Sequence, residues 1–211
     1  VFIDSLYSSI ITAGTHRAET IQIAEASKVI ENIQRDVNIA LINQFSMIFD
    51  ELSIDTSSVL QAAGTKWNFM NFKPGLVGGH CIGVDPFYLI HKANKIGIDS
   101  ELIKTARAIN DNMSRFAIRK LVKRCVSRGI RLDKARVLIV GFSFKENCPD
   151  IRNTKVLDLY NEAVEWFGSV SVEDSIVSSE DVMHEYGLKI NSAEEELYDA
   201  IILAVPHNYI L

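Results

Sequence analysis

The spacing of hydrophobic and polar positions divides the chain into two parts. Over residues 17–52, apolar side chains recur mostly at steps of three, four or seven, with no proline or glycine among them. This pattern predicts one amphipathic helix, about 50 Å long at 1.5 Å per residue. A similar pattern with a step close to 3.5 predicts a long helix over residues 100–128, packed along another helix within the chain or in a second subunit. Two short helices are expected between them, over residues 56–63 and 86–97.

The remainder of the chain alternates between strand and helix patterns. Strands are predicted at residues 136–142, 170–174 and 200–205. Helices are predicted between them at residues 153–167 and 180–186. Strands joined by helices over short intervals indicate a parallel, doubly wound sheet. We therefore expect an α/β protein with a helical domain over residues 1–132 and a partial sheet domain over residues 133–211.

The composition is that of a globular chain of 211 residues, 47% of them apolar. Its 22 basic and 27 acidic side chains give a net charge of −5, which lends no support to nucleic-acid binding. No apolar run reaches the ~18 residues that cross a bilayer, and the N-terminal segment lacks a signal-peptide pattern. We therefore expect a cytoplasmic protein with no membrane partner. The chain does not begin with methionine and stops just after an apparent strand, so we expect both ends to be cut.

One loop concentrates residues suited to chemistry. Residues 66–86 contain four glycines and two prolines, as expected of backbone that takes special angles or approaches a ligand. Within this loop Cys81 follows Gly78 and Gly79 and precedes a helix, a setting that favours a nucleophilic thiolate. The alternative is a small buried cysteine. Asp85 would either cap the following helix or act as a base beside the thiol.

The cysteines bear on the class of protein. Cys81, Cys125 and Cys148 are widely spaced and form no CxxC motif, which argues against a disulfide framework and against a zinc site. Since His80 adjoins Cys81, a cysteine hydrolase is one alternative. Adjacent residues in an extended loop point apart, however, and no cysteine-protease signature is present.

The first long helix offers a second group of candidates. Lys28 and Asn32 are four residues apart and therefore share one helix face, with Arg35 a turn further on. An ammonium group and an amide that converge on one point are suitable donors to a developing oxyanion. The alternative is an ordinary solvated face, because Glu25 and Glu31 lie nearby.

A third group follows the first predicted strand. Doubly wound sheets bind ligands at the carboxyl ends of their strands. At that position Lys145 and Arg152 suit phosphate groups, and Phe144 suits stacking on a base. The alternative is a surface loop that leads into the next helix. Because no GxGxxG motif is present, most of any dinucleotide site is expected to lie elsewhere.

The chain resembles the UDP-glucose/GDP-mannose dehydrogenases in four blocks that occur in family order. The blocks lie at residues 24–41, 66–89 (which contain GGHCIGVDP), 106–113 and 144–155. The likeness is closest to the UDP-N-acetylglucosamine and UDP-N-acetylgalactosamine 6-dehydrogenases of bacterial surface polysaccharide synthesis. It implies an NAD-binding Rossmann domain, a helical domain that forms a homodimer, and a Rossmann-like domain that binds the UDP-sugar. On this basis we expect the chain to lack the first domain and part of the third.

The resemblance also implies roles for the matching residues. Cys81 would capture the C6 aldehyde as a thiohemiacetal and hold it, after a second hydride transfer to NAD, as a thioester that water hydrolyses to the uronate. Lys28 and Asn32 would stabilise the oxyanion and orient water, and Asp85 would assist them.

The resemblance extends to binding. Phe144 and Lys145 would contact UDP, Arg152 would reach the NAD, and Lys66 would offer a cation across the dimer. The segment that wraps the sugar and the pyrophosphate includes Phe69, Phe72, Pro74, Gly75, Gly78 and Gly79.

The expected fold is thus α/β, a long-helix dimerisation domain followed by a truncated Rossmann-like, doubly wound parallel sheet. The expected function is that of a fragment of an NAD-dependent UDP-N-acetylhexosamine 6-dehydrogenase, inactive by itself and free of metal. The alternative from another class is a stand-alone module that binds UDP-sugars or dimerises without catalysis.

Overall fold

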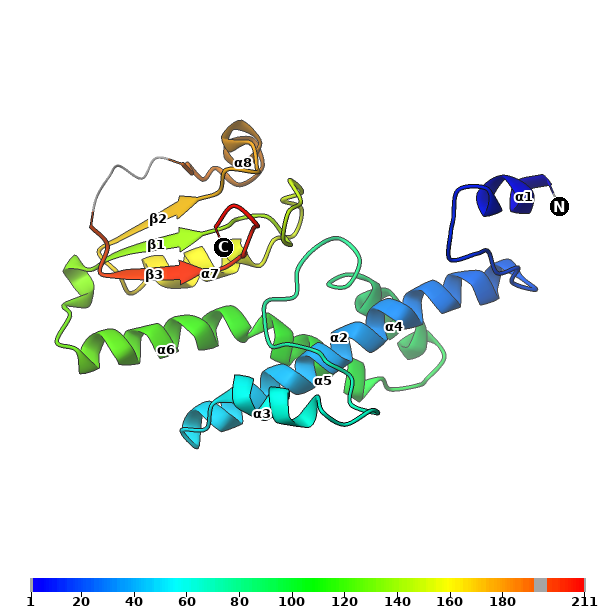
Figure 1. The fold of residues 1–211 in the computed structure, drawn as a ribbon, viewed down its shortest axis with the longest axis horizontal. Coiled ribbons are helices and arrows are strands. Elements are labelled where there is room, and N and C mark those ends of the chain that lie inside the picture. The colour runs from blue at the N-terminus through cyan, green and yellow to red at the C-terminus, as the bar shows by residue number, and fades with distance from the viewer. Residues whose placement is uncertain (1, 192–196, 211) are drawn as a thin grey trace.

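The computed structural model describes residues 2–191 and 197–210 (Figure 1). A helical part is followed by a small part of strands and helices. The helices of the first part are α1 (Phe2–Ser8), α2 (Ile21–Glu51), α3 (Thr56–Ala63), α4 (Asp85–Lys95), α5 (Glu101–Asp111) and α6 (Met113–Ser127). The second part comprises a 3₁₀ turn (Leu132–Lys134), β1 (Arg136–Val140), α7 (Val156–Val164), β2 (Ser169–Glu173), α8 (Ser179–Tyr186) and β3 (Ala200–Leu203).

Helix α2 is the long amphipathic helix that the apolar spacing predicts. It begins after Thr20, whose hydroxyl accepts a hydrogen bond from the N–H of Ile23 at 3.2 Å. It packs on α5 and buries Ile33, Ala40 and Ile42. Although α2 has 31 residues, neither it nor any other described helix is apolar enough for its length to span a membrane. Helix α1, which the sequence pattern did not predict, lies far from the sheet (Figure 1).

The prediction of a single helix over residues 100–128 is wrong in one respect, because the structure divides this segment into α5 and α6 at Asn112. The N–H of Asn112 is shared between the carbonyls of Ala108 and Ile109, both at 3.2 Å, so a 3₁₀-type hydrogen bond accompanies the α-helical one at this point. The two halves also have different partners, since α5 packs on α2 and α6 packs on α7. The apolar seam therefore packs within the chain at Ala106 and Met113, whereas Leu102 is 70% exposed.

Strand β1 is the centre of a three-stranded parallel sheet with the order β2-β1-β3. In its register Val137 lies opposite Val170 of β2 and Ala200 of β3. Parallel sheets are covered on both faces, and accordingly Val137 and Ile139 of β1 are fully buried. The α/β class and the parallel sheet that the sequence predicts are confirmed.

The core of the sheet extends into α6. Figure 1 shows α7 against the sheet and α6 running alongside α7. Ile118 and Cys125 of α6 are buried in the same apolar cluster as Val137 of β1 and Leu159 of α7. The α5–α6 pair therefore packs with its first half on the helical part and with its second half on the sheet.

A series of alternating charges connects the two parts. Asp36 of α2 is fully buried and pairs with Arg107 of α5 at 2.6 Å, and Arg107 also pairs with Asp111 at 2.5 Å. Asp111 lies 3.0 Å from the ammonium group of Lys155, which pairs with Asp158 of α7 at 2.9 Å. The series thus runs from α2 through α5 to the beginning of α7.

The pKa values of Asp36 and Lys155 in this series are shifted from their ordinary values. Burial raises the pKa of Asp36 above its ordinary value, although Arg107 and Asn110 act in the opposite direction through charge and hydrogen bonds. Burial also lowers the pKa of Lys155, but its two carboxylate partners outweigh this effect and raise the pKa overall. Each buried charge therefore depends on its partners.

We expect Asp36→Ala to lower the free energy of unfolding by about 3 kcal/mol, because it deprives the buried guanidinium of Arg107 of one of its two carboxylates. Urea denaturation followed by circular dichroism measures this change. Asp99→Ala is the matched control, since it removes only an exposed pair with Lys104 and should leave the midpoint unchanged. Equal shifts for the two variants would contradict the importance given to the buried pair.

Candidate active site

The loop between α3 and α4 runs from α3 toward the sheet before it enters α4 (Figure 1). Asn43 of α2 holds its middle: the amide donates to the carbonyl of Gly75 at 3.0 Å and accepts from the N–H of Gly75 at 2.8 Å. Asn43 is fully buried and bonded to Asn110 of α5 at 2.8 Å, and Asn110 in turn donates to Asp36. The polar network between α2 and α5 therefore positions the loop.

Paired glycines dock the loop on the sheet domain. The N–H of Gly79 donates to the carbonyl of Asn153 at 3.0 Å, and a Cβ at Gly78 would lie only 2.7 Å from that carbonyl oxygen. Gly79 has a φ of +88°, and a Cβ there would meet the ring of Phe144 at 2.8 Å. A side chain at either position would separate the loop from the sheet domain.

Cys81 lies where the loop turns into α4. Its carbonyl accepts hydrogen bonds from the N–H groups of Val84, at 3.0 Å, and of Asp85, at 2.8 Å. The thiol is free and half-buried, and it lines a cleft of about 450 Å³ that we call the thiol cleft. Other residues that line the thiol cleft include Lys28, Asn32, Arg35, His80, Phe144 and Lys145.

Beside the thiol cleft, three side chains form a relay of hydrogen bonds. The ammonium group of Lys28 donates to the Oδ1 of Asn32 at 3.3 Å, and the Nδ2 of Asn32 donates to the Oδ2 of Asp85 at 2.5 Å. Asn32 is buried, whereas Lys28 is exposed and also pairs with Glu31 at 2.9 Å. Residues from α2 and from the beginning of α4 thus meet at one point. Asn32 and Asp85 are 53 positions apart in the sequence.

Asp85 does not cap α4, so that alternative is wrong. The residue before the helix is Val84, which makes no side-chain capping bond, and Asp85 is the first residue of the helix. Pro86 has no N–H, so the first turn has one donor fewer to satisfy. The carboxylate of Asp85 instead turns to Asn32, a tertiary contact that local sequence does not reveal.

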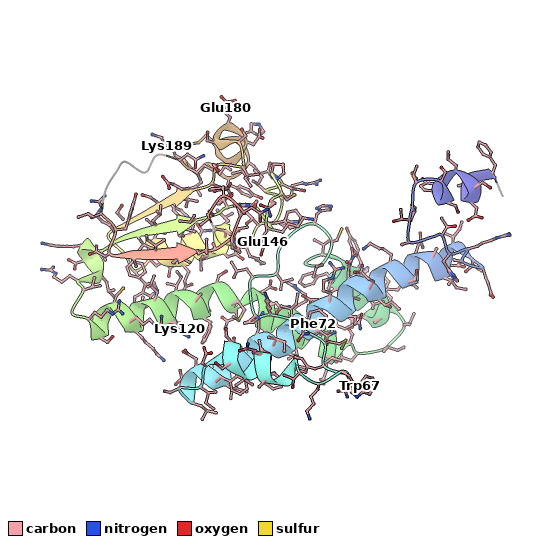
Figure 2. The ribbon with its side chains drawn as sticks, in the orientation of Figure 1. Trp67, Phe72, Lys120, Glu146, Glu180 and Lys189 are labelled. Atoms are coloured by element: carbon pink, nitrogen blue, oxygen red, sulfur yellow. The ribbon has the colours of Figure 1, made fainter. Side chains whose placement is uncertain are left out.

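A larger cavity of about 870 Å³ lies at the carboxyl ends of β1 and β3, and we call it the strand-end groove. Its lining includes Lys73, Pro74, Gly75, Ser143, Glu146, Thr154 and Pro206. Parallel sheets bind ligands at this end. Figure 2 shows Glu146 at this edge of the sheet. The ammonium group of Lys145 lies 5.3 Å from the centre of the Phe144 ring, which is a cation–π contact.

The strand-end groove and the thiol cleft share part of their walls. Leu76, Gly78, Phe144 and Lys145 line both cavities. An elongated ligand can therefore lie with one end at the sheet and the other end beside Cys81. Nine of the predicted residues line one or both of these adjoining cavities: Lys28, Asn32, Pro74, Gly75, Gly78, Gly79, Cys81, Phe144 and Lys145. Asp85 lines neither cavity and joins the site through its hydrogen bond from Asn32.

Three predicted binding residues lie outside both cavities. Phe69 and Phe72 are half-buried and Lys66 is exposed, and none of them lines the strand-end groove or the thiol cleft. Figure 2 shows Phe72 and the neighbouring Trp67 on the part of the loop beside α2 and α5, away from the sheet. Their proposed contacts therefore stay predictions.

Arg152 also points elsewhere. Its guanidinium makes a bidentate pair with Asp150, at 3.0 Å through Nε and 2.6 Å through an outer nitrogen. This pair lowers the pKa of Asp150 to about 2, against a smaller opposite effect of burial. His80 packs edge-on against Phe144 with its Nδ1 3.9 Å from Asp150, and among the described residues it makes no hydrogen bond to Cys81. This arrangement does not favour a cysteine hydrolase.

Sequence reasoning missed several residues that build the site. Arg35 was noted only as the next residue on the helix face of Lys28, yet it lines the thiol cleft. Asn43 and Arg107 look like ordinary surface residues in the sequence, although both are buried. Lys73 and Pro206 line the strand-end groove. The one sequence signal for this position is that Lys73 precedes GGHC in the same loop and that Pro206 follows the last strand.

Two family models match the chain, and together they cover most of it. Residues 22–112, which supply α2 and the loop of the thiol cleft, match the central domain of the UDP-glucose/GDP-mannose dehydrogenase family. Residues 138–211, which supply the sheet, match the UDP binding domain of the same family. The chain therefore belongs to this family, as the four sequence blocks indicated.

Individual relatives are similar over nearly the whole chain. A UDP-N-acetyl-D-glucosamine 6-dehydrogenase of Pseudomonas aeruginosa is 58% identical over 98% of the chain and 49% of its own length. One of Salmonella typhi is 52% identical over 97% of the chain and 48% of its length. The solved UDP-D-ManNAc dehydrogenase of Pyrococcus horikoshii superposes with a TM-score of 0.83 at 28% identity, over 99% of the chain and 47% of that structure. The chain spans about half the length of these relatives.

We expect Gly79→Ala to weaken UDP binding about tenfold, because the new Cβ must displace the Phe144 ring from the wall that the two cavities share. Calorimetric titration with UDP measures the change. Gly97→Ala is the control: Gly97 also has a positive φ, +75°, but a Cβ there would have nothing within 4 Å. If the two variants lose affinity equally, backbone strain is the cause and the contact with Phe144 is not.

Proposed function

We propose that the chain forms the substrate-binding, thiol-bearing part of a cytoplasmic, NAD-dependent UDP-N-acetylhexosamine 6-dehydrogenase of surface polysaccharide synthesis. Such an enzyme oxidises the C6 alcohol of the sugar to a uronic acid. The proposal depends on the junction of the two cavities, where Leu76, Gly78, Phe144 and Lys145 line both. A UDP-sugar that spans the junction has its nucleotide at the sheet and its sugar beside Cys81. The names of the similar curated enzymes support this substrate class.

The strand-end groove offers the groups that a uridine diphosphate requires. The ring of Phe144 is an apolar face for the base or the ribose. Lys145 and Lys73 supply positive charge for the diphosphate, and the loop around Pro74 and Gly75 brings backbone close to it. These groups come from the helical part as well as from the sheet, so the substrate would bind across both.

The thiol cleft offers the groups for acyl chemistry. As a thiolate, Cys81 attacks the C6 aldehyde, a C–S bond forms and the carbonyl electron pair moves to oxygen, which gives a thiohemiacetal. Loss of hydride from C6 converts this adduct to a thioester. Water then adds to the thioester carbon and loses its two protons to the solvent, and the C–S bond breaks to release the uronate and the thiolate of Cys81. NAD, when bound, accepts the hydride in each of the two oxidations.

Lys28 and Asn32 would donate hydrogen bonds to the oxygen that becomes negative in each of these steps. The relay prepares Asn32 for this role, because Lys28 holds its carbonyl oxygen and Asp85 holds one of its N–H groups. The amide retains a second N–H for the substrate oxygen or for water. Asp85 would thus assist by orienting the amide.

NAD would be held mainly by a domain outside this chain, because the chain spans about half the length of its relatives and has no GxGxxG motif. Of the residues present, Arg152 is the one that we propose for NAD. Its guanidinium is exposed and always charged, which suits an anionic dinucleotide. Asp150 occupies that guanidinium in the structure, so binding would require an exchange of partners.

We expect Cys81→Ser to abolish uronate formation by the full-length enzyme while UDP-N-acetylglucosamine still binds, since only the thiol is lost. The absorbance of NADH measures turnover, and calorimetric titration with UDP-N-acetylglucosamine measures binding. Cys148→Ser is the control and should keep its activity, because Cys148 lines neither cavity. Unchanged NADH production by Cys81→Ser would exclude the thiol mechanism. A wild-type protein that binds the sugar nucleotide but forms no NADH would favour the binding module without catalysis.

A stripe of exposed apolar residues along α2 and at Leu52, which caps its C-terminal end, supports a homodimer through the helical part. Its members lie on one helix face, at 100° per residue, and leave apolar surface unpaired. They are Ile23, Ile30, Leu41, Phe45, Ile48 and Leu52. A second copy of the chain would cover this stripe, and in such a dimer the exposed Lys66 would offer its charge to the neighbouring subunit.

We expect the double variant Leu41→Asp, Ile48→Asp to be monomeric, because two charges in the centre of the stripe oppose its burial. Sedimentation velocity measures the mass. Val126→Asp introduces a charge at an exposed apolar position of α6 and should leave a dimer intact. If the wild type, the double variant and Val126→Asp are all dimers, the subunit interface lies on another surface.

A further inference from the structure

One buried histidine joins the loops that follow all three strands. His207 comes after β3 and has no solvent-exposed surface. Its Nε2 lies 3.0 Å from the Oδ2 of Asp174, which follows β2, and 3.3 Å from the Oγ of Ser143, which follows β1. Its Nδ1 accepts a hydrogen bond from the backbone N–H of Asn147 at 2.9 Å. Both nitrogens of the ring therefore have partners from other segments.

The partners determine which nitrogen holds the proton. Since Nδ1 accepts the N–H of Asn147, it is unprotonated, and the proton lies on Nε2 and faces the Asp174 carboxylate. Ser143 and Asp174 approach the same nitrogen, so the three residues are not a nucleophile–base–acid triad, in which the serine and the carboxylate face opposite nitrogens. The hydroxyl of Ser143 instead donates to the carbonyl of Lys145 at 2.8 Å.

Asp174 anchors the beginning of the β1 loop. Its Oδ2 accepts hydrogen bonds from the N–H groups of Phe142, at 2.7 Å, and of Ser143, at 3.2 Å, and its Oδ1 accepts from Ile176 at 2.8 Å. Burial raises the pKa of Asp174, but these hydrogen bonds and the one from His207 outweigh it and lower the pKa overall. The carboxylate is thus a fixed acceptor for His207.

The two contacts of His207 with the β1 loop lie on either side of Phe144 and Lys145. Ser143 immediately precedes this pair, and Asn147 follows it by two residues. Phe144 and Lys145 line both the strand-end groove and the thiol cleft. A loop attached only at its ends would let these two side chains change position, whereas contacts at Ser143 and Asn147 restrict the backbone that carries them.

We propose that His207 is a positioning residue for the UDP-sugar: through the hydrogen bond that its Nδ1 accepts from Asn147, it holds Phe144 and Lys145 where the nucleotide binds. This inference rests on the proposed function, since it assigns the two side chains to that substrate. His207 itself touches no reacting atom. Its loss should therefore weaken binding of the nucleotide and leave the chemical step at saturating substrate nearly unchanged.

Two substitutions separate the two hydrogen bonds of the ring. The amide of His207→Gln can reach Asp174 as a donor but leaves the N–H of Asn147 without an acceptor. The amide of His207→Asn offers its oxygen near the position of Nδ1 and retains that acceptor. His184→Gln, at an exposed position of α8, is the control. Each variant is made in this chain for calorimetric titration with UDP and in the full-length enzyme for steady-state kinetics.

We expect His207→Gln to bind UDP about tenfold more weakly and to raise KM for UDP-N-acetylglucosamine similarly, with kcat within about twofold of wild type. His207→Asn should recover most of the affinity, and His184→Gln should match wild type. Unchanged affinity in His207→Gln, equal losses in both His207 variants, or a loss confined to kcat would overturn the positioning role. Absence of UDP binding by the wild-type chain would instead refute the proposed function.

A measurement on the wild-type chain covers the case in which the His207 variants do not fold. Hydrogen exchange of the Asn147 amide, followed by NMR, should slow about tenfold or more when UDP is added, because nucleotide binding stabilises the loop that this amide anchors. An Asn147 amide whose exchange does not change at saturating UDP would overturn the proposal.

Discussion

The buried ion pair between Asp36 and Arg107 is the contact on which the site depends. Two charges removed from water must pair in good geometry, and a shift of α2 along α5 would separate Asp36 from Arg107 and leave the guanidinium with Asp111 as its one carboxylate partner in this series. The position of α2 along α5 also places Asn43 against Gly75, and so determines where the loop that carries Cys81 lies. Through Asp111 the series continues to Lys155 at the beginning of α7, so one set of charges relates the helical part to the sheet. Among the described residues, Asp36 Oδ2 and Arg107 Nε have no hydrogen-bond partner, which fits a pair that specifies position more than it adds stability.

Periodicity alone predicted the features that repeat along the sequence. It predicted α2, the strands of the parallel sheet and the shared face of Lys28 and Asn32, because a helix repeats every 3.6 residues and a strand every two. It did not predict the break at Asn112, which has no proline or glycine to signal it, nor the turn of Asp85 away from the helix end toward Asn32. Contacts between segments far apart in sequence decide both. The division between domains at residues 132 and 133 stays a prediction, and the packing of α6 on α7 gives the sheet domain a neighbour from the helical side.

Local patterns offered Cys81, Lys28, Asn32, Phe144 and Lys145 only as one of two alternatives, and the resemblance to the dehydrogenases favoured the functional one. It also added residues that no local pattern indicated, such as Phe69 and Phe72, and the structure does not bring all of these residues to the two cavities. Cys81, Lys28 and Asn32 line one cleft, Asp85 is hydrogen-bonded to Asn32 beside it, and Phe144 forms part of the wall that the cleft shares with the strand-end groove. Phe69 and Phe72 belong to the same loop but line neither cavity, and a local sequence match cannot distinguish a residue that contacts the ligand from one that supports the loop. The paired glycines explain why the loop can join the two cavities at all, because only backbone without a Cβ can approach Asn153 and Phe144 so closely.

The central claim is that the strand-end groove and the thiol cleft form one site for one substrate. A crystal structure of the Cys81→Ser variant with UDP-N-acetylglucosamine tests it most directly. The account predicts the uracil and the diphosphate in the groove beside Phe144 and Lys145, with C6 of the sugar about 3–3.5 Å from the Oγ of the introduced serine. A nucleotide bound in the groove with its sugar directed into solvent, or a sugar nucleotide bound elsewhere on the chain, would contradict it.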